Sequence, residues 1–426
     1  MNEEGIVRKK FWEGIEIVRK NLIEEDNGIV VGFETEYNLL SDDLTPAPGE
    51  KVQRLIEKRE GRGMELGAYQ IELKTNPHNG KSIKVICDIL KENEKNLMDN
   101  CKQENLHILR MGAVPNINPQ NIQVGNNERY RIVPKYHDER RGSHIKTKIG
   151  GIDFDSAACV GLFSAVQINI QAKDIHDGID KVNRALMIGP YVAAICGNSR
   201  IINGIDTGFN DIRLPAWEAT HDLRRFSDMN KDNRVGLPKY YKDIDDYLTR
   251  ISEQPFIFDL KNEDPLKVVG VGMGLNWKDA RLKFIREKNR FYPVVELRLI
   301  PTQPSVEEDV AAMFFYIGRI AYSQRKEEEF LPIGKVRLNR DQALIYGLEG
   351  MIYSPNGDKL RTDIKKVVDE EISKAEEGLV DLGFERAEAK YFLDYLRERK
   401  QTPSYRFAEE VRQNGLEIVV RQHLLK

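Results

Sequence analysis

Four short stretches of the chain place an acid, an amide or an arginine at positions i and i+2 within a run of apolar residues. They span 32–36, 69–73, 166–170 and 295–299. Because side chains alternate between the two faces of a strand, the polar pair of each stretch points one way, roughly 7 Å apart. Side by side, four such strands would give one sheet face that carries Glu34, Glu36, Gln70, Glu72, Gln167, Asn169, Glu296 and Arg298. Carboxylates this close repel one another unless cations lie between them, so the pattern predicts a cation-binding sheet face.

The residue types indicate which cation the face would hold. Carboxylate and amide oxygens are the ligands that Mg²⁺ and Mn²⁺ prefer, and such clusters usually serve phosphate chemistry. Zinc is not favoured, because the histidines are scattered and the four cysteines form no CxxC pair. Arg298 either neutralises the acids around it or binds a transferring phosphoryl group. A single strand of this kind is more often a half-solvated sheet face, but four strands with the same choice of residues favour a site.

Composition excludes several classes of protein. The 426 residues are 40% hydrophobic and 31% charged, and 65 basic against 68 acidic residues give a formal charge of -3. Without a long basic tract, nucleic-acid binding is not expected. Without an apolar run of about 18 residues or an apolar leader, we expect neither a membrane span nor a signal peptide. The unpaired cysteines are typical of a reduced, cytoplasmic protein.

Hydrophobic periodicity predicts the elements that must position these residues. We expect strands at 29–37, 68–75, 164–171 and 293–300, and helices at 6–24, 82–98, 177–196 and from 306, where Ser305 and Glu308 have capping-box spacing. The last hundred residues are predicted to be mainly helical, at 340–346, 362–380, 384–400 and 404–424. Strands separated by long, varied insertions favour an α+β fold with an antiparallel sheet. The chain divides into a catalytic region, 1–330, and a helical region, 331–426, or forms one domain overall.

Three further segments are harder to place. The stretch 41–63, rich in Pro, Gly and charge, is predicted to be a mobile loop. The stretch 115–150 is also loop-like and locally basic, which fits a solvated loop, a binding loop or a lid. The sequence VGVGMG at 269–274 lacks GxGxxG spacing and is predicted to be a strand that needs small residues for close packing. No GxxxxGK[ST] motif occurs, so the chain is not a P-loop enzyme.

Several motifs together resemble the glutamate–cysteine ligase family and its carboxylate–amine ligase relatives, in the glutamine synthetase-like superfamily. In chain order they are GFETEYNLL, ELGAYQIELKTNP, NERY, SAVQINIQAKD, CGNSRIINGIDTGFNDIRLPAW, YPVVELRLIPTQPSVEED and LNRDQALIYGLEG. The resemblance covers most of the chain. It implies a curved antiparallel sheet with helices on its outer face and a helical C-terminal segment.

The resemblance also implies an activity and a set of roles. Such a ligase activates a carboxylate, usually the γ-carboxylate of glutamate, as an acyl phosphate with ATP, and an amine then displaces the phosphate. The implied metal ligands, for Mg²⁺ or Mn²⁺, are Glu34, Glu36, Glu65, Glu72, Gln167 and Glu296. Arg213 and Arg298 would bind the ATP phosphates and, with Glu34, act in catalysis; Gln70, Arg129, Asn169 and Trp217 would lie near the amino-acid substrate.

Departures from the family pattern leave the substrates open. Arg200 and Ile201 follow Asn198-Ser199 where many members have Pro-Phe, and Gln167 replaces the histidine of a more distant bacterial branch. The acceptor amine need not be cysteine, nor the donor acid glutamate. The alternatives are a guanidino kinase-type phosphotransferase and a regulatory protein that keeps a degenerate metal site. The expected partners are ATP and small amino acids or amines, without nucleic acid or membrane, and the sequence does not decide between a monomer and a homo-oligomer.

Overall fold

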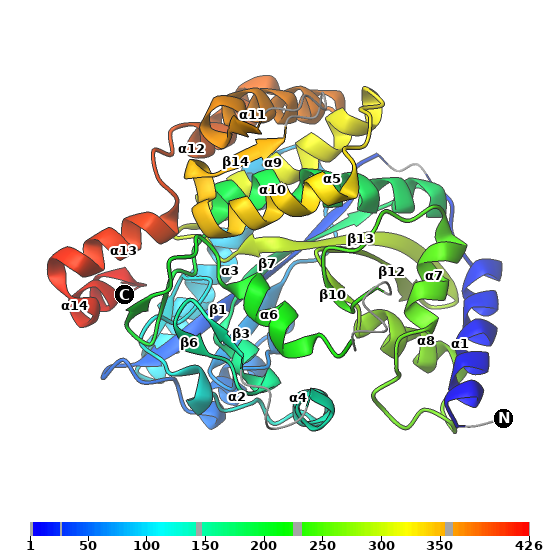
Figure 1. Cartoon of the computed structure of the whole chain (residues 1–426), viewed down its shortest axis with the longest axis horizontal. Helices are drawn as coiled ribbons and strands as arrows, with labels where there is room; N and C mark the ends of the chain where they lie inside the picture. The colour runs from blue at the N-terminus through cyan, green and yellow to red at the C-terminus, as the bar shows by residue number, and fades with distance from the viewer. Residues whose placement is uncertain (1–2, 26–27, 142–146, 225–231, 354–360, 426) are drawn as a thin grey trace.

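An antiparallel sheet of eight strands lies at the centre of the molecule (Figure 1). The computed structural model describes residues 3–25, 28–141, 147–224, 232–353 and 361–425. The strands run in the order β12-β13-β7-β1-β3-β2, while β4 pairs with β1 and β16 with β4. Their bounds are β1 Val31–Ser41, β2 Arg62–Met64, β3 Gln70–Lys74, β4 Leu106–Leu109, β7 Ala165–Gln171, β12 Ala280–Glu287, β13 Arg290–Pro301 and β16 Leu424–Leu425. The predicted α+β class and antiparallel sheet are therefore confirmed, and the sheet is strongly curled.

The cavity described below lies on one face of this sheet and is lined in part by the helices that carry Arg129 and Trp217. Helices pack around the sheet (Figure 1). They are α1 Glu3–Lys20, α2 Gly49–Glu57, α3 Ile83–Gln103, α4 Glu128–Arg141, α5 Ile175–Cys196, α6 Arg213–His221, α7 Ile244–Ser252, α8 Pro265–Gly274, α9 Val306–Arg325, α10 Ile333–Tyr346, α11 Ile364–Asp381, α12 Arg386–Arg397, α13 Pro403–Asn414 and α14 Leu416–His423. Short strand pairs join β5 Lys148–Ile149 to β6 Ile152–Asp153, β8 Ile201–Ile202 to β9 Ile205–Asp206, β10 Val235–Gly236 to β11 Trp277–Lys278, and β14 Met351–Tyr353 to β15 Arg361–Asp363. Single turns of 3₁₀ helix lie at Pro119–Asn121 and Gly347–Glu349, with a longer one at Ala157–Leu162.

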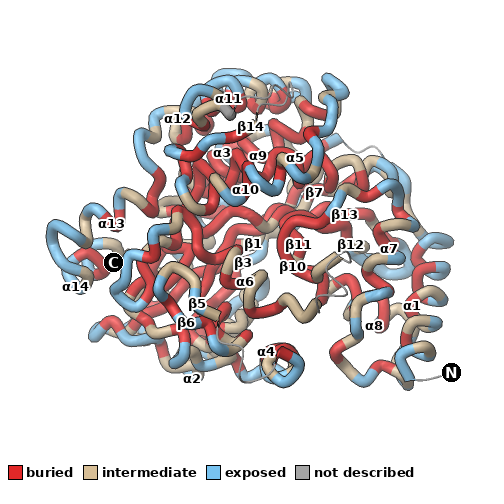
Figure 2. The backbone as a smooth tube through the Cα atoms, in the orientation of Figure 1, coloured by how far each residue is buried: buried red, intermediate tan, exposed pale blue. Residues whose placement is uncertain are grey.

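The main core lies between the sheet and helices α5 and α9, with α11 packed on α9, and the central strands of the sheet are mostly buried in Figure 2. Helix α5 is apolar on nearly every side, as a helix enclosed by others must be. Helices α9 and α11 cross closely, since a Cβ at Gly378 would stand 1.9 Å from the carbonyl oxygen of Gly318. Helix α10 packs on α5, and α12 packs on α9. The division of the chain into a catalytic region, 1–330, and a helical region, 331–426, stays a prediction.

Three sequence predictions are wrong. The expected mobile loop at 41–63 contains α2 and β2, because Val52 and Leu55 form a buried helical stripe among the charges. The expected loop at 115–150 contains α4, whose pattern was obscured by Pro134 inside the helix. The expected strand at 269–274 belongs to α8, which begins at Pro265 after the Asp264 cap. In the last two cases a proline lies inside the helix or at its first residue.

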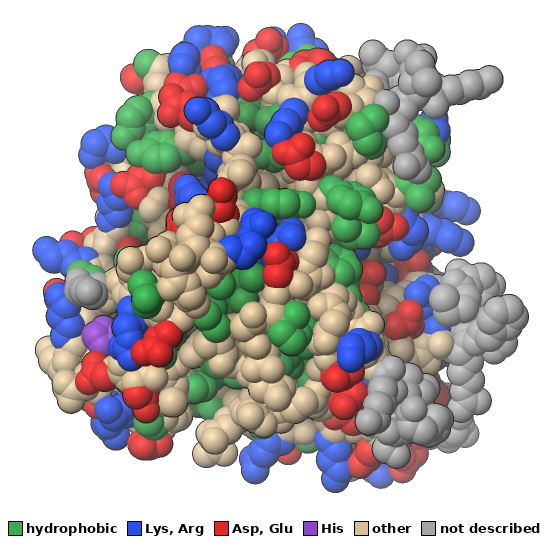
Figure 3. All heavy atoms as spheres, turned by 60° about the vertical axis from the view of Figure 1, so that its left-hand side comes forward, with side chains coloured by type: hydrophobic (Ala, Val, Ile, Leu, Met, Phe, Trp, Pro, Cys, Tyr) green, Lys and Arg blue, Asp and Glu red, His purple; other side chains and the backbone are tan. Residues whose placement is uncertain are grey.

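The remaining predicted elements lie within a few residues of their expected bounds, with two exceptions: the helix expected at 340–346 begins at Ile333, and the one expected at 404–424 is two helices that meet at Gly415. The Ser305 hydroxyl caps α9 by accepting from Glu308 N at 3.2 Å. The four cysteines are free and buried. Within the described residues, no helix is long and apolar enough to cross a membrane. On the face that carries α13 and α14, basic and acidic side chains are interspersed (Figure 3).

Candidate active site

The four predicted i/i+2 pairs share one face of the sheet. Strand register places Glu36 opposite Glu72, Glu34 opposite Gln167, and Glu296 opposite Asn169. This face forms the floor of a cavity of about 380 Å³. The predicted site residues that line the cavity are Glu34, Glu36, Glu65, Gln70, Glu72, Arg129, Gln167, Arg213, Trp217, Glu296 and Arg298, so Asn169 is the one predicted residue outside this lining.

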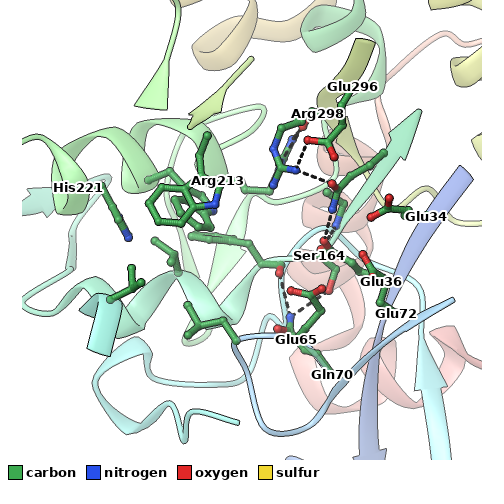
Figure 4. Close-up of a pocket in the computed structure, with 18 of the residues that line it drawn as sticks. Glu34, Glu36, Glu65, Gln70, Glu72, Ser164, Arg213, His221, Glu296 and Arg298 are labelled. Carbon is green, nitrogen blue, oxygen red and sulfur yellow. Dashed lines mark hydrogen bonds and ion pairs between the residues drawn. The ribbon is translucent and has the colours of Figure 1, made fainter. Parts of the chain in front are cut away.

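Three carboxylates converge at the centre of the floor, and we call Glu36, Glu65 and Glu72 the carboxylate cluster (Figure 4). One oxygen from each lies within 4.8 Å of the others, the only such group of acids, histidines or cysteines among the described residues. Glu36 is fixed by Gln167 Nε2 at 2.8 Å and by Ala165 N at 2.7 Å. Oxygen ligands held at this separation suit a hard divalent cation.

The electrostatics of the cluster also call for a cation. Burial and the nearby Glu36 carboxylate raise the pKa of Glu65 to about 8. Burial, Glu65 and Glu34 raise the pKa of Glu72 well above its ordinary range, and burial raises that of Glu36. Lys74 is paired with Glu72 at 2.6 Å, yet the pKa values of the three acids stay raised, so this one cation does not compensate all three carboxylates. A divalent cation would supply the missing charge.

The carboxylate of Glu296, in contrast, is paired with several cations and its pKa is lowered. Its carboxylate is paired with Arg281, with Lys283 at 2.7 Å and with Arg298 at 2.8 Å. Burial opposes ionisation of this carboxyl, yet these cations hold its pKa well below the ordinary value. Glu34 is 3.8 Å from Lys283 and accepts from Asn169 Nδ2 at 3.0 Å. Three of the six predicted metal ligands, Glu34, Gln167 and Glu296, therefore lie outside the carboxylate cluster, and their role as ligands stays a prediction.

The two predicted phosphate-binding arginines flank the cluster. Arg298 donates to Gln167 Oε1 at 2.5 Å, which ties its guanidinium to a neighbour of Glu36. Arg213 begins α6 and donates to the carbonyl oxygen of Leu299 at 2.6 Å. It is buried, and its Nε has no acceptor among the described residues. This Nε lies 3.8 Å from the buried Asp211 carboxylate, so the charge of the guanidinium is partly paired within the protein.

A buried loop carries Arg213 into place. Asp211 Oδ1 accepts from the Ser199 hydroxyl at 2.6 Å and from Arg213 N at 2.9 Å. The loop is then fastened by the chain's C-terminal part, because the Ser404 hydroxyl donates to the Asn210 carbonyl at 2.5 Å and accepts from Ser199 N at 2.9 Å. Residues 404 and 199 are thus joined directly.

The side chains predicted to bind substrate differ in the contacts that they already make within the protein. The Gln70 amide is buried and engaged at both ends: Nε2 donates to Asn38 and to the Phe163 carbonyl, and Oε1 accepts from Gly67 N at 3.1 Å. Arg129 donates to the Gly274 carbonyl at 2.8 Å and extends over the Trp277 ring. Trp217 stacks on His221 with ring centroids 4.6 Å apart. Burial lowers the pKa of His221 well below its usual range, so this ring is neutral.

The sequence reasoning missed several residues that line the cavity. Arg281 and Lys283 of β12 and Lys74 of β3 supply its cations, and Tyr130 of α4 donates to the Met64 carbonyl at 2.6 Å beside Glu65. The first three were detectable, because Arg281 and Lys283 form an i/i+2 pair and Lys74 continues the series of Gln70 and Glu72. Trp277 and His221 carry no pattern in the sequence that could have found them.

Comparisons with known proteins bear on the family and the fold of the chain. The family model described as glutamate–cysteine ligase family 2 matches residues 30–376. The glutamate–cysteine ligase of Francisella tularensis, solved with AMP, has a similar fold: TM-score 0.63 at 15% identity, over 95% of this chain and 90% of that one. A bifunctional glutathione synthetase from Pasteurella multocida gives a TM-score of 0.57 at 11% identity, over 99% of this chain and 54% of that one. No curated protein matches the sequence significantly.

The two structures show the fold alone at these identities, and the chain spans about half the length of the second. The family-model match covers most of the chain and confirms the resemblance found in the motifs. It also gives the class of activity, which is that of an ATP-dependent ligase.

Proposed function

Because the chain belongs to glutamate–cysteine ligase family 2, we propose that it activates a carboxylate as an acyl phosphate and transfers the acyl group to an amine. The donor acid is proposed to be an amino acid with a γ-carboxylate such as glutamate, and the products an amide, ADP and phosphate. One observation carries the proposal: the carboxylate cluster and two arginines line a single cavity.

The carboxylate cluster fits Mg²⁺ or Mn²⁺, because every donor is an oxygen and their raised pKa values call for a cation. Gln167 would join these ligands through its amide oxygen, and Glu34 and Glu296 would complete the set beside them. When bound, the metal would neutralise charge on the phosphates of ATP and orient the terminal one.

The arginines act on the group that is transferred. Arg298 and Arg213 present guanidinium groups at the cluster, where the charge of the transferring phosphoryl group develops. Their positions are fixed before substrate binds, Arg298 by Gln167 and Glu296, and Arg213 by backbone carbonyls. Preorganised donors of this kind stabilise a transition state without reorganising during the reaction.

The amino-acid substrates would occupy the part of the cavity that holds Arg129 and Trp217. Arg129 supplies a cation for a substrate carboxylate, and Trp217 supplies an apolar wall. Asn169 is bonded to Glu34 and would act at the nucleotide end of the site. The predicted contact of Gln70 with substrate competes with the bonds that already engage its amide.

Release of ADP with ATP and Mg²⁺ tests the proposal, measured across a matrix of amino acids and amines with products identified by mass. We expect ADP and phosphate in equal amounts with a new amide, and loss of all three in Glu36→Gln. ADP release with a phosphorylated guanidino product and no free phosphate would instead support the phosphotransferase alternative. If no acid and amine together stimulate ADP release, the ligase assignment is wrong.

A further inference from the structure

One end of the active-site cavity is lined by aromatic and apolar side chains. His221 lies well apart from the carboxylates of Glu34 and Glu36 in Figure 4. The His221 ring is 4.6 Å from the ring of Trp217 on α6 and 5.6 Å from the ring of Trp277 on β11, measured between centroids. We call this end the apolar wall, and its members that line the cavity are Val133, Pro134, Leu214, Trp217, His221 and Trp277.

The apolar wall carries no charge. Burial holds the pKa of His221 well below its usual range. His137, behind it on α4, packs on the His221 ring at 4.5 Å, and burial lowers the pKa of His137 to about 4. Both imidazoles are therefore neutral near pH 7. Trp217 and Trp277 are half-buried, so each ring keeps surface that a ligand can contact.

Arg129 differs from the other basic side chains of the cavity, because no carboxylate of the described residues lies within 4.0 Å of its guanidinium. That guanidinium lies 5.9 Å from the centroid of the Trp277 ring, beside the apolar wall. Every other basic side chain of the lining has a carboxylate within that distance. They are Lys74, Arg213, Lys278, Arg281, Lys283 and Arg298.

The acids of the lining beyond the acidic floor are also paired. They are Glu218 and Asp279, and both bind Arg340 of α10, at 2.5 and 2.6 Å. Within the described part of the chain, the apolar wall therefore has one free cation beside it and no free carboxylate. Two amino-acid substrates would bring two α-carboxylates to this end, and a diamine would bring a second ammonium.

We infer that Arg129 binds the α-carboxylate of the donor acid, and that the acceptor is a primary amine with an apolar body, without a carboxylate or a second ammonium. The inference rests on the proposed ligase function and names its acceptor class. A second carboxylate would be buried beside neutral rings without a partner, which is costly. An aromatic or aliphatic body is instead stabilised by contact with Trp217 and Trp277.

The transfer step needs nothing from the acceptor except its amine. The lone pair of the neutral nitrogen attacks the acyl carbon of the acyl phosphate and forms the C–N bond. The C–O bond to phosphorus-bound oxygen breaks, and phosphate leaves with that electron pair and takes up the proton that the nitrogen loses. The products are an N-substituted amide and inorganic phosphate.

Pairs of acceptors that differ only in charge test the inference. Release of ADP would be measured with MgATP, glutamate and either phenethylamine or phenylalanine, cysteamine or cysteine, and butylamine or 1,4-diaminobutane. We expect the first member of each pair to have a kcat/KM at least about a hundredfold higher, because the second member brings a charge that finds no partner.

Two variants assign the binding groups. Trp217→Ala should raise the KM for phenethylamine about tenfold and leave the KM for glutamate within about twofold. Arg129→Gln should do the reverse. Tyr391→Ala is the control, because this aromatic side chain is 59% exposed on α12 and should leave both KM values unchanged.

Hydroxylamine separates failure of this inference from failure of the ligase proposal. It traps an acyl phosphate as a hydroxamate and needs no apolar body. Hydroxamate formation without acceleration by any apolar amine would overturn the acceptor assignment and leave the ligase proposal intact, as would a faster reaction with phenylalanine or cysteine than with the decarboxylated partner. If neither hydroxamate nor ADP forms with any acid, both are wrong.

Discussion

Replacing Glu65 by glutamine tests the carboxylate cluster without any substrate. The folded pKa of Glu65 is about 8, because of burial and Glu36, against an ordinary value of 4.5. A carboxyl group with a raised pKa binds more protons in the folded than in the unfolded state. The stability of the metal-free protein should therefore fall as the pH rises from about 4.5 to about 8, and the full penalty is present above that window.

The size of the penalty follows from the same pKa. Each pKa unit corresponds to about 1.4 kcal/mol, so the rise from 4.5 to about 8 sets an upper bound of about 5 kcal/mol. Glu65 keeps partial contact with solvent, which screens the repulsion. We therefore expect the uncharged Glu65→Gln protein to be about 2 to 4 kcal/mol more stable than the unmodified protein in EDTA at about pH 8.5. Near pH 5 the two should be similar.

Chemical denaturation with EDTA or Mg²⁺ measures both effects. Mg²⁺ at about a hundred times its Kd should stabilise the unmodified protein by about 2.7 kcal/mol and Glu65→Gln by less, because the variant lacks a ligand. Glu409→Gln is the control: it removes an exposed charge on α13 and should behave as the unmodified protein. If Glu65→Gln is the less stable protein in EDTA, or if Mg²⁺ stabilises both equally, the cluster is not a metal site of this kind.

Three other substitutions test the parts around the cluster. Arg298→Lys keeps the charge but loses the planar donors that reach Gln167 and Glu296, so kcat should fall by about 10² to 10³ while ATP affinity changes little; an unchanged kcat would contradict this role. Gln70→Leu removes the acceptor of Gly67 N, which fixes the turn after Glu65. Calorimetry should therefore show Mg²⁺ affinity about 10- to 100-fold weaker. If only the KM for the amino acid rises, Gln70 binds substrate instead. Ser404→Ala removes the two hydrogen bonds that hold the loop before Arg213. The free energy of unfolding should fall by about 1 to 2 kcal/mol, and kcat should also fall. Unchanged stability would contradict this role of Ser404.

The sequence could predict the sheet because its signal is local. Alternation along each strand fixes which side chains share a face, whereas the register that brings Glu36 opposite Glu72 comes from the structure. The cavity walls could not be predicted in this way. Helix α4 contains a proline, and its Tyr130 contacts the strand of Glu65 only through the tertiary fold. Nor does spacing in the chain reveal that Glu296 is paired with three cations while only Glu72 of the cluster has an ion-pair partner among the described residues, since that depends on which strands are neighbours.

This uneven neutralisation predicts the order in which cations bind. In the carboxylate cluster only Glu72 has an ion-pair partner among the described residues, Lys74 at 2.6 Å, so a first divalent ion can bind at Glu36 and Glu65 and share or displace that one ammonium. A second ion between Glu34 and Glu296 must displace Lys283 from both, at a site where Glu296 is also paired with Arg281 and Arg298. The displaced ammonium then needs another anion, which the phosphates of ATP would supply. We expect one Mn²⁺ per chain without nucleotide and a second only with a non-hydrolysable ATP analogue, counted from the EPR signal of free Mn²⁺. Lys283→Met removes the competing charge and should let the second ion bind without nucleotide. If the unmodified protein binds two ions before nucleotide is added, Lys283 does not compete with the second ion for Glu34 and Glu296, and the predicted order is wrong.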